Sequence, residues 1–197
     1  MDDNLNAFLK VIDPTDNTTG GGTASAIAGA MGASLAAMVA RLSIGKDGMQ
    51  PDAFYREAIE QLETLHERLF AGGYIDSQAF ESVSSAFKLP KSTDEEKKAR
   101  SVAIQAGWVH ATNVPLDNAE RCAEVAKSAL YLKSQSNQNA ASDLECGFHL
   151  AKAGLKGCIA NVEINLPMIK DAAKKADLTD RLEKLKQSVG NMQWEEN

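Results

Sequence analysis

Apolar residues recur every three or four positions along most of the chain. A clear example is the series that follows Pro51, which consists of Phe54, Ala58, Leu62, Leu65 and Leu69. Residues at this spacing lie on one face of an α-helix, so the series predicts a helix with one apolar face. No segment of four or more residues shows the alternation and β-branched enrichment of a strand. The pattern therefore predicts an all-α bundle.

Residues that stop or start helices divide the bundle into seven or eight segments. Gly72-Gly73 are expected to end the helix that starts at Pro51, and a new helix is expected from Asp76. Pro115 is expected to open another helix after one that ends near Thr112. The length suits one packed core, so we expect a single domain over residues 1–197.

The stretch TTGGGTASAIAGAMGASLAAMVA, from Thr18 to Ala40, has no charged residue and few large ones. Small residues fill two helical faces at four-residue spacing, which lets a neighbouring backbone approach closely. We therefore expect a central Gly/Ala-rich helix packed on several sides. A membrane span is not expected, because it takes its free energy from large apolar side chains and few are present here.

Charge and cysteine content exclude several classes of protein. The chain has 21 Lys and Arg against 27 Asp and Glu, so its net charge is −6 and no nucleic-acid partner is expected. Its three cysteines show no CxxC spacing and its three histidines have no spaced partner, so neither a disulfide framework nor a metal site is expected. The N-terminus lacks a basic segment ahead of an apolar one. We expect a cytoplasmic protein with reduced thiols.

Three consecutive glycines, Gly20, Gly21 and Gly22, come just before the small-residue helix. A glycine turn at a helix N-terminus presents free backbone N–H groups and the positive end of the helix dipole, which together suit an anion. No Gly-Lys-Ser/Thr follows and no strand precedes, so neither a P-loop nor a dinucleotide fingerprint is present. The alternative is a flexible turn with Thr23 as the helix cap.

A second group of residues shares one stripe of the helix predicted from Ser142 to Leu166. Its members recur at steps of three or four: Asp143, Gly147, Leu150, Gly154, Cys158, Asn161 and Asn165. Glycine costs roughly 1 kcal/mol in a helix interior, so the glycines indicate close contact with a neighbouring backbone or a ligand. The stripe is either part of a site or a seam between helices, and the seam could lie at a dimer interface.

Six sequence blocks follow one another along nearly the whole chain: GGGTASAIAGAMGASLAAMVARLSIGK from Gly20, DSQAF from Asp76, KLPKSTDEEKKAR from Lys88, NVPL from Asn113, SDLECG from Ser142 and NVEINL from Asn161. In this order they resemble the formiminotetrahydrofolate cyclodeaminase and methenyltetrahydrofolate cyclohydrolase family. Two positions depart from the family pattern. Thr19 stands where a proline usually precedes the glycines, and Thr23 stands where serine often follows them.

The resemblance implies an all-helical homodimer whose substrate is a tetrahydrofolate derivative and which needs no further cofactor. It implies a carboxylate that transfers a proton beside positive charge, with Asp76 as the first candidate and Asp143 as the second. Both could instead be helix caps. Gly20, Gly21, Gly22 and Thr23 would hold the folate, and Asn161 and Asn165 would bond the pterin edge or line the dimer seam.

Two reactions fit this resemblance. A cyclohydrolase adds water to 5,10-methenyltetrahydrofolate to give 10-formyltetrahydrofolate, and a cyclodeaminase expels ammonia from 5-formiminotetrahydrofolate. No formiminotransferase segment accompanies the 197 residues, so we expect the cyclohydrolase. The alternatives are the cyclodeaminase and, from a different class, a non-catalytic folate-binding or dimeric helical scaffold.

Overall fold

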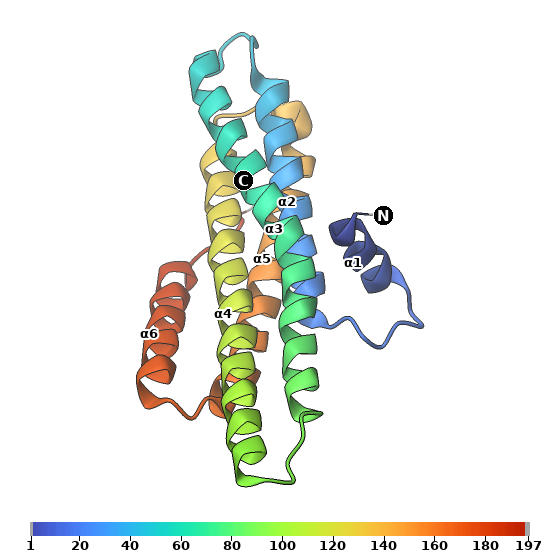
Figure 1. Cartoon of the computed structure of the whole chain (residues 1–197). Helices are drawn as coiled ribbons and strands as arrows, with labels where there is room; N and C mark the ends of the chain where they lie inside the picture. Colours follow the sequence, from blue (N-terminus) through green and yellow to red (C-terminus); the bar gives the residue numbers. More distant parts are fainter. Residues whose placement is uncertain (1, 196–197) are drawn as a thin grey trace.

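The structure, a computed structural model, describes residues 2–195, and this part of the chain contains helices and no strand (Figure 1). Its six α-helices are α1 (Asp3–Ile12), α2 (Gly21–Ser43), α3 (Asp52–Phe87), α4 (Asp94–Leu132), α5 (Ala141–Asn165) and α6 (Ala172–Val189). Two short 3₁₀ helices, η1 (Gln138–Ala140) and η2 (Leu166–Met168), flank α5. The predicted all-α bundle is confirmed. The predicted count of seven or eight helices is wrong.

The count is wrong because two expected breaks lie inside continuous helices. α3 runs through Gly72-Gly73, and both glycines are buried against neighbouring helices, where their lack of a side chain permits close packing. α4 runs through Pro115. A proline has no N–H for the carbonyl four residues earlier, here that of Ala111, and the side-chain amide of Asn165 donates to this oxygen at 2.8 Å instead. Tertiary contacts thus compensate for both local breaks.

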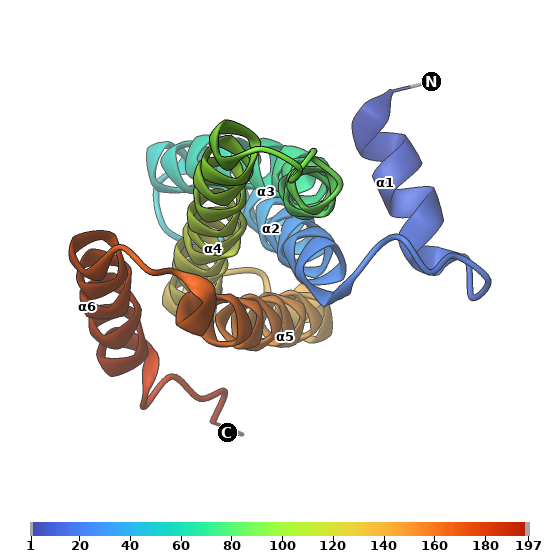
Figure 2. The ribbon, with the colours of Figure 1, turned by 60° about the horizontal axis from the view of Figure 1, so that its bottom comes forward.

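The four long helices α2 to α5 surround a common interior, with α1 and α6 outside it on opposite sides (Figure 2). α2 is the central helix that the small-residue stretch predicted. It is also long and apolar enough to cross a bilayer by length and composition, but 67% of its most apolar 18-residue window is buried inside the bundle. Its apolar character therefore serves the core.

Glycines let the backbones of α2 and α5 touch. A Cβ atom at Gly32 would lie 2.6 Å from the carbonyl oxygen of Gly147, and one at Gly154 would lie 2.5 Å from that of Ser25. Real Cβ atoms essentially never come this close to backbone. The middle of the α5 stripe is therefore a seam between helices within one chain, one of the two alternatives that the spacing left open.

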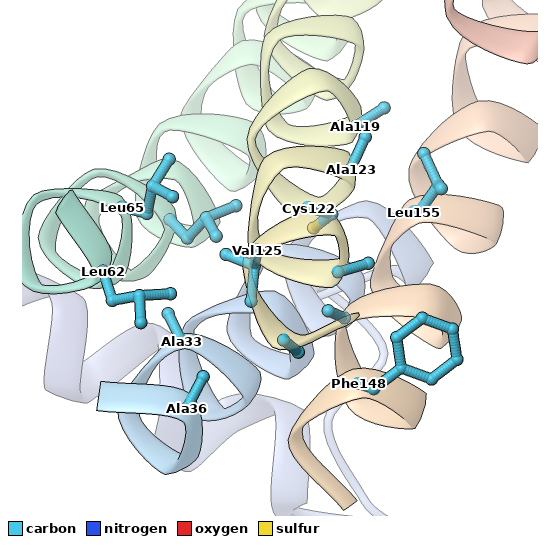
Figure 3. Close-up of a cluster of buried hydrophobic side chains, with 14 of the residues drawn as sticks. Ala33, Ala36, Leu62, Leu65, Ala119, Cys122, Ala123, Val125, Phe148 and Leu155 are labelled. Atoms are coloured by element: carbon cyan, nitrogen blue, oxygen red, sulfur yellow. The ribbon is translucent and has the colours of Figure 1, made fainter. Parts of the chain in front are cut away.

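Larger side chains fill the rest of the core. Figure 3 shows Leu62 of α3 and Val125 of α4 directed toward the alanines of α2, and Phe148 of α5 on the other side of its helix. There the ring of Phe148 packs against that of Trp194. Leu62, Val125 and Phe148 are fully buried. A smaller cluster of Ala79, Val83, Ala111 and Val114 joins α3 to the middle of α4.

Candidate active site

A cleft of about 550 Å³ opens where the first turn of α2 meets the second half of α3, the middle of α4 and the C-terminal end of α5. Six of the eight residues proposed from the sequence line it: Gly20, Gly22, Thr23, Asp76, Asn161 and Asn165. The seventh, Gly21, lies beside it, because a Cβ atom there would be 3.5 Å from the side-chain nitrogen of Asn161. Residues up to 145 positions apart in the sequence thus meet at one place.

Small residues allow α2 and α3 to come together at the cleft. A Cβ atom at Gly22 would lie 2.5 Å from Oδ2 and 2.6 Å from Oδ1 of Asp76. Further along α3, a Cβ atom at Gly73 would lie 3.2 Å from the side chain of Ile27. The glycines of both helices therefore set how closely the Asp76 carboxylate approaches the first turn of α2.

Thr23 holds the Asp76 carboxylate at this position. Its hydroxyl, which is fully buried, donates to Oδ2 of Asp76 at 3.1 Å. Its backbone N–H belongs to the first turn of α2 and is one of the groups that have no partner within the helix. The glycine turn was expected to attract an anion, and the anion that it faces in this chain is the carboxylate of Asp76.

Burial raises the pKa of Asp76 above its ordinary value of 3.8. The hydroxyl and the backbone N–H of Thr23 oppose this effect, because both bond to the charged form. The balance leaves a carboxyl group that is less acidic than a surface aspartate. A carboxyl group with a raised pKa in a cleft is better suited to accept and return a proton than a surface aspartate.

A second titratable group lies behind Asp76. A hydrogen bond with Cys122, burial, and the charge of Asp76 all raise the pKa of the Cys158 thiol well above its ordinary value. Both cysteines are free and fully buried. Cys158 is therefore a neutral packing group on the core side of the cleft.

The two asparagines of the cleft have fixed amide orientations. Asn161 donates from Nδ2 to the carbonyl oxygen of Gly157 at 3.0 Å, and Asn165 donates from Nδ2 to that of Ala111 at 2.8 Å. A backbone carbonyl can only accept, so the nitrogen of each amide faces the backbone. What each side chain can still offer a ligand is its acceptor oxygen and the second N–H of its amide.

Apolar side chains form the other walls of the cleft, and none of them is among the eight residues proposed from the sequence. They are Phe80, Trp108, Ile164 and Met168. Phe80 is 58% exposed and Ile164 is 73% exposed, although apolar side chains of this size are normally buried. Periodicity alone assigns such residues to the core. The signal that could have revealed Ile164 is its position among polar neighbours, away from the apolar stripe of α5.

Asp143 does not lie at the cleft. It is half-buried in the first turn of α5, 18 residues before Asn161 in the same helix, which corresponds to about 27 Å along the axis. Of the two candidate carboxylates, the structure therefore brings only Asp76 to the glycine turn. Across residues 2–195, no group of three or more His, Cys, Asp or Glu side chains is arranged to hold a metal ion.

Comparison with known proteins relates the chain to folate enzymes. Residues 4–184 match the model of a family described as formiminotransferase-cyclodeaminase. A methenyltetrahydrofolate cyclohydrolase from Methylorubrum extorquens is 37% identical over 94% of this chain and 90% of its own length. A formimidoyltransferase-cyclodeaminase from Gallus gallus is 36% identical over 92% of this chain, which spans 34% of that relative.

A solved structure shares the fold. The crystal structure of a formiminotetrahydrofolate cyclodeaminase from Thermotoga maritima superposes with a TM-score of 0.81 at 27% identity. The match covers 94% of this chain and 89% of the other.

Proposed function

Because the chain belongs to the formiminotransferase-cyclodeaminase family, we propose that it is an enzyme of folate one-carbon metabolism that hydrolyses 5,10-methenyltetrahydrofolate to 10-formyltetrahydrofolate. The observation that carries the proposal is the half-buried Asp76 carboxylate, held by Thr23 in a cleft with apolar walls. The methenyl substrate carries its positive charge on the amidinium ring. A half-buried carboxylate without a cationic partner among the lining residues is complementary to that charge.

In the proposed mechanism Asp76 acts as the proton-transfer group. A water molecule attacks the cationic methenyl carbon, and its oxygen forms a bond to that carbon while Asp76 takes a proton from it. The resulting carbinolamine collapses, so the bond between N5 and the carbon breaks and the N10 formyl group forms. N5 receives a proton as it leaves, and one proton is released overall. The raised pKa of Asp76 suits both acceptance and return of the proton.

The walls of the cleft would orient the folate. Phe80, Trp108, Ile164 and Met168 offer apolar and aromatic surface to its rings. The acceptor oxygens of Asn161 and Asn165 match the N–H and amino donors on the pyrimidine edge of the pterin. Gly20, Gly21 and Gly22 would let the ring system approach the backbone of the first turn of α2.

Cyclodeaminase activity is the second candidate, and the names of several relatives favour it. In that reaction N10 attacks the formimino carbon, and Asp76 would move the proton from N10 to the departing ammonia. The same carboxylate and the same methenyl cation serve both reactions.

Homodimer formation and a cytoplasmic location stay proposals. The dimer is supported by exposed apolar residues on α1 and α2, among them Leu5, Ile12 and Met31.

The test is to mix the purified protein with 5,10-methenyltetrahydrofolate and to follow the decay of its absorbance. We expect decay well above the buffer rate, and we expect Asp76→Asn to abolish most of the acceleration. Ammonia release from 5-formiminotetrahydrofolate without methenyl hydrolysis would assign the chain to the cyclodeaminases instead. Folate binding without either reaction would indicate a non-catalytic scaffold and refute the proposal.

A further inference from the structure

Asn118 is a fully buried polar residue of α4 that contacts α3 one turn before Asp76. Its Nδ2 donates to the carbonyl oxygen of Gly72 at 3.2 Å, and its Oδ1 accepts from Nη1 of Arg121 at 3.0 Å. A buried amide is costly unless its groups are bonded, and here both ends of the amide have a partner. Asn118 lies outside the cleft lining, so contact with a substrate does not account for it.

Gly72 is the residue that makes room for Asn118. A Cβ atom at Gly72 would overlap Oδ1 of Asn118 and would lie 2.9 Å from its Cγ. The amide of Asn118 therefore lies flat against the backbone of α3. Two consecutive glycines are the weakest part of a helix, because each loses more backbone freedom on folding than any other residue. The side chain of Asn118 in α4 thus stabilises α3 at the two-glycine turn, which is its weakest part.

The carbonyl that Asn118 contacts also belongs to the turn that carries Asp76. In an α-helix the carbonyl of residue i accepts the N–H of residue i+4, so the Gly72 carbonyl is the acceptor for the N–H of Asp76. A carbonyl oxygen has two lone pairs and can accept both bonds. Asn118 therefore donates to the same carbonyl oxygen of Gly72 that accepts the backbone N–H of Asp76.

We propose that Asn118 is a positioning residue that holds the Gly72–Asp76 turn of α3 so that the Asp76 carboxylate meets Thr23 and the substrate. Arg121 contributes to this role, because its guanidinium donates a hydrogen bond to the amide oxygen of Asn118 and so holds the amide from the other side. The inference rests on the proposed function, since it assigns Asn118 the role of positioning Asp76, the proposed proton-transfer group. Without Asn118 the two-glycine turn loosens and the carboxylate moves away from Thr23 into a more exposed position.

The test replaces Asn118 with leucine, which has a similar shape but cannot donate to Gly72. We expect kcat to fall about tenfold or more with KM changed less than about twofold, because a displacement of 1 Å costs about 10²-fold. The pKa of Asp76, followed by carboxyl-detected NMR on the substrate-free protein, is expected to fall toward 3.8 as the group gains solvent. In the Asp76→Asn background, Asn118→Leu is expected to cause no further loss of kcat.

Tyr55→Phe is the matched control. Tyr55 also joins α3 to another segment, through a hydrogen bond from its hydroxyl to the carbonyl of Gln135 in the turn after α4. It lies 21 residues from Asp76 along α3, about 32 Å away. We expect this variant to have a lower melting temperature, while kcat and the pKa of Asp76 stay unchanged.

The outcomes separate the inference from the function on which it rests. If Asn118→Leu keeps its kcat and the pKa of Asp76, or loses activity only in step with its folded fraction, the positioning role is refuted. If the unmodified protein turns over neither folate, the proposed function fails, while the NMR comparison still decides the positioning role. Should Asn118→Leu not fold, Arg121→Gln is expected to lower kcat at least threefold with the same direction of pKa change, and an unchanged pKa would refute the role.

Discussion

A single methyl group added at Gly22 is expected to remove activity without removing stability. The Cβ atom of Gly22→Ala would lie 2.5 Å from Oδ2 of Asp76, whereas ordinary contacts begin at 3.4 Å. The carboxylate must therefore retreat by about 0.9 Å. A misplacement of about 1 Å at a reacting group costs on the order of 10²-fold in rate. We expect kcat to fall by that factor.

The cost in stability is expected to be small because the displaced atoms are the end of a flexible side chain. Loss of the bond from Thr23 to Asp76 costs about 1.5 kcal/mol, a value typical of bonds to charged groups. The preference of a helix for alanine over glycine returns about 1 kcal/mol. The two effects nearly cancel, so the melting temperature should stay within about 3 °C of the unmodified protein.

Gly32→Ala gives the contrasting variant on the same helix. Its Cβ atom would lie 2.6 Å from the backbone carbonyl of Gly147, which cannot swing aside. Separating α2 from α5 should cost about 2 kcal/mol, or roughly 4–8 °C in melting temperature. Turnover per folded molecule should be unchanged.

The assay measures kcat, KM and melting temperature on both variants and on the unmodified protein. Normal kcat in Gly22→Ala would refute the claim that the Asp76 carboxylate must occupy its observed position. A fall in melting temperature in Gly22→Ala as large as that in Gly32→Ala would refute the claim that the Asp76 side chain yields more easily than the backbone carbonyl of Gly147.

Three further predictions follow from the site and the core. Asp76→Asn should lower kcat by roughly 10²–10⁴-fold. It should also raise the melting temperature near pH 7, because a folded-state pKa above 3.8 means that the ionised group destabilises the fold, and this gain should vanish as the pH falls toward 3.8. Thr23→Val removes a donor to the carboxylate, so the acidic limb of the kcat profile should move to higher pH, and an unmoved limb would exclude Asp76 as the titrating group. Phe148→Ala should cost about 3–5 kcal/mol in denaturant unfolding, since Phe148 is fully buried, and a smaller loss would mean that the core collapses around the gap.

Periodicity and composition predicted the all-α fold and the central position of α2, because both depend on which faces of each helix are apolar or small. Helix ends were predicted less well. Gly72-Gly73 and Pro115 are local signals for a break, and each is overridden by a partner distant in the sequence, Asn118 in one case and Asn165 in the other. A single sequence does not show which distant side chain will satisfy a given backbone group.

The eight proposed site residues come from the sequence blocks that resemble the family, and seven of the eight lie in or beside the cleft. Asp143 is the exception. It shares a helical stripe with Asn161, and a stripe fixes the direction of a side chain without its distance along the axis. The apolar walls were missed because exposed apolar residues and core residues have the same periodicity.

The contact between α2 and α5 has a consequence for how this sequence can change over time. In an ordinary core a lost methyl group can be replaced by a larger neighbour, so substitutions drift in compensating pairs. At Gly32, Gly147 and Gly154 the helices touch through backbone atoms, and each position already carries the smallest residue. Every available substitution adds volume and none can be balanced by trimming the opposite side. These three positions, one on α2 and two on α5, are therefore expected to tolerate almost no substitution, while side chains in the surrounding core can still change in compensating pairs.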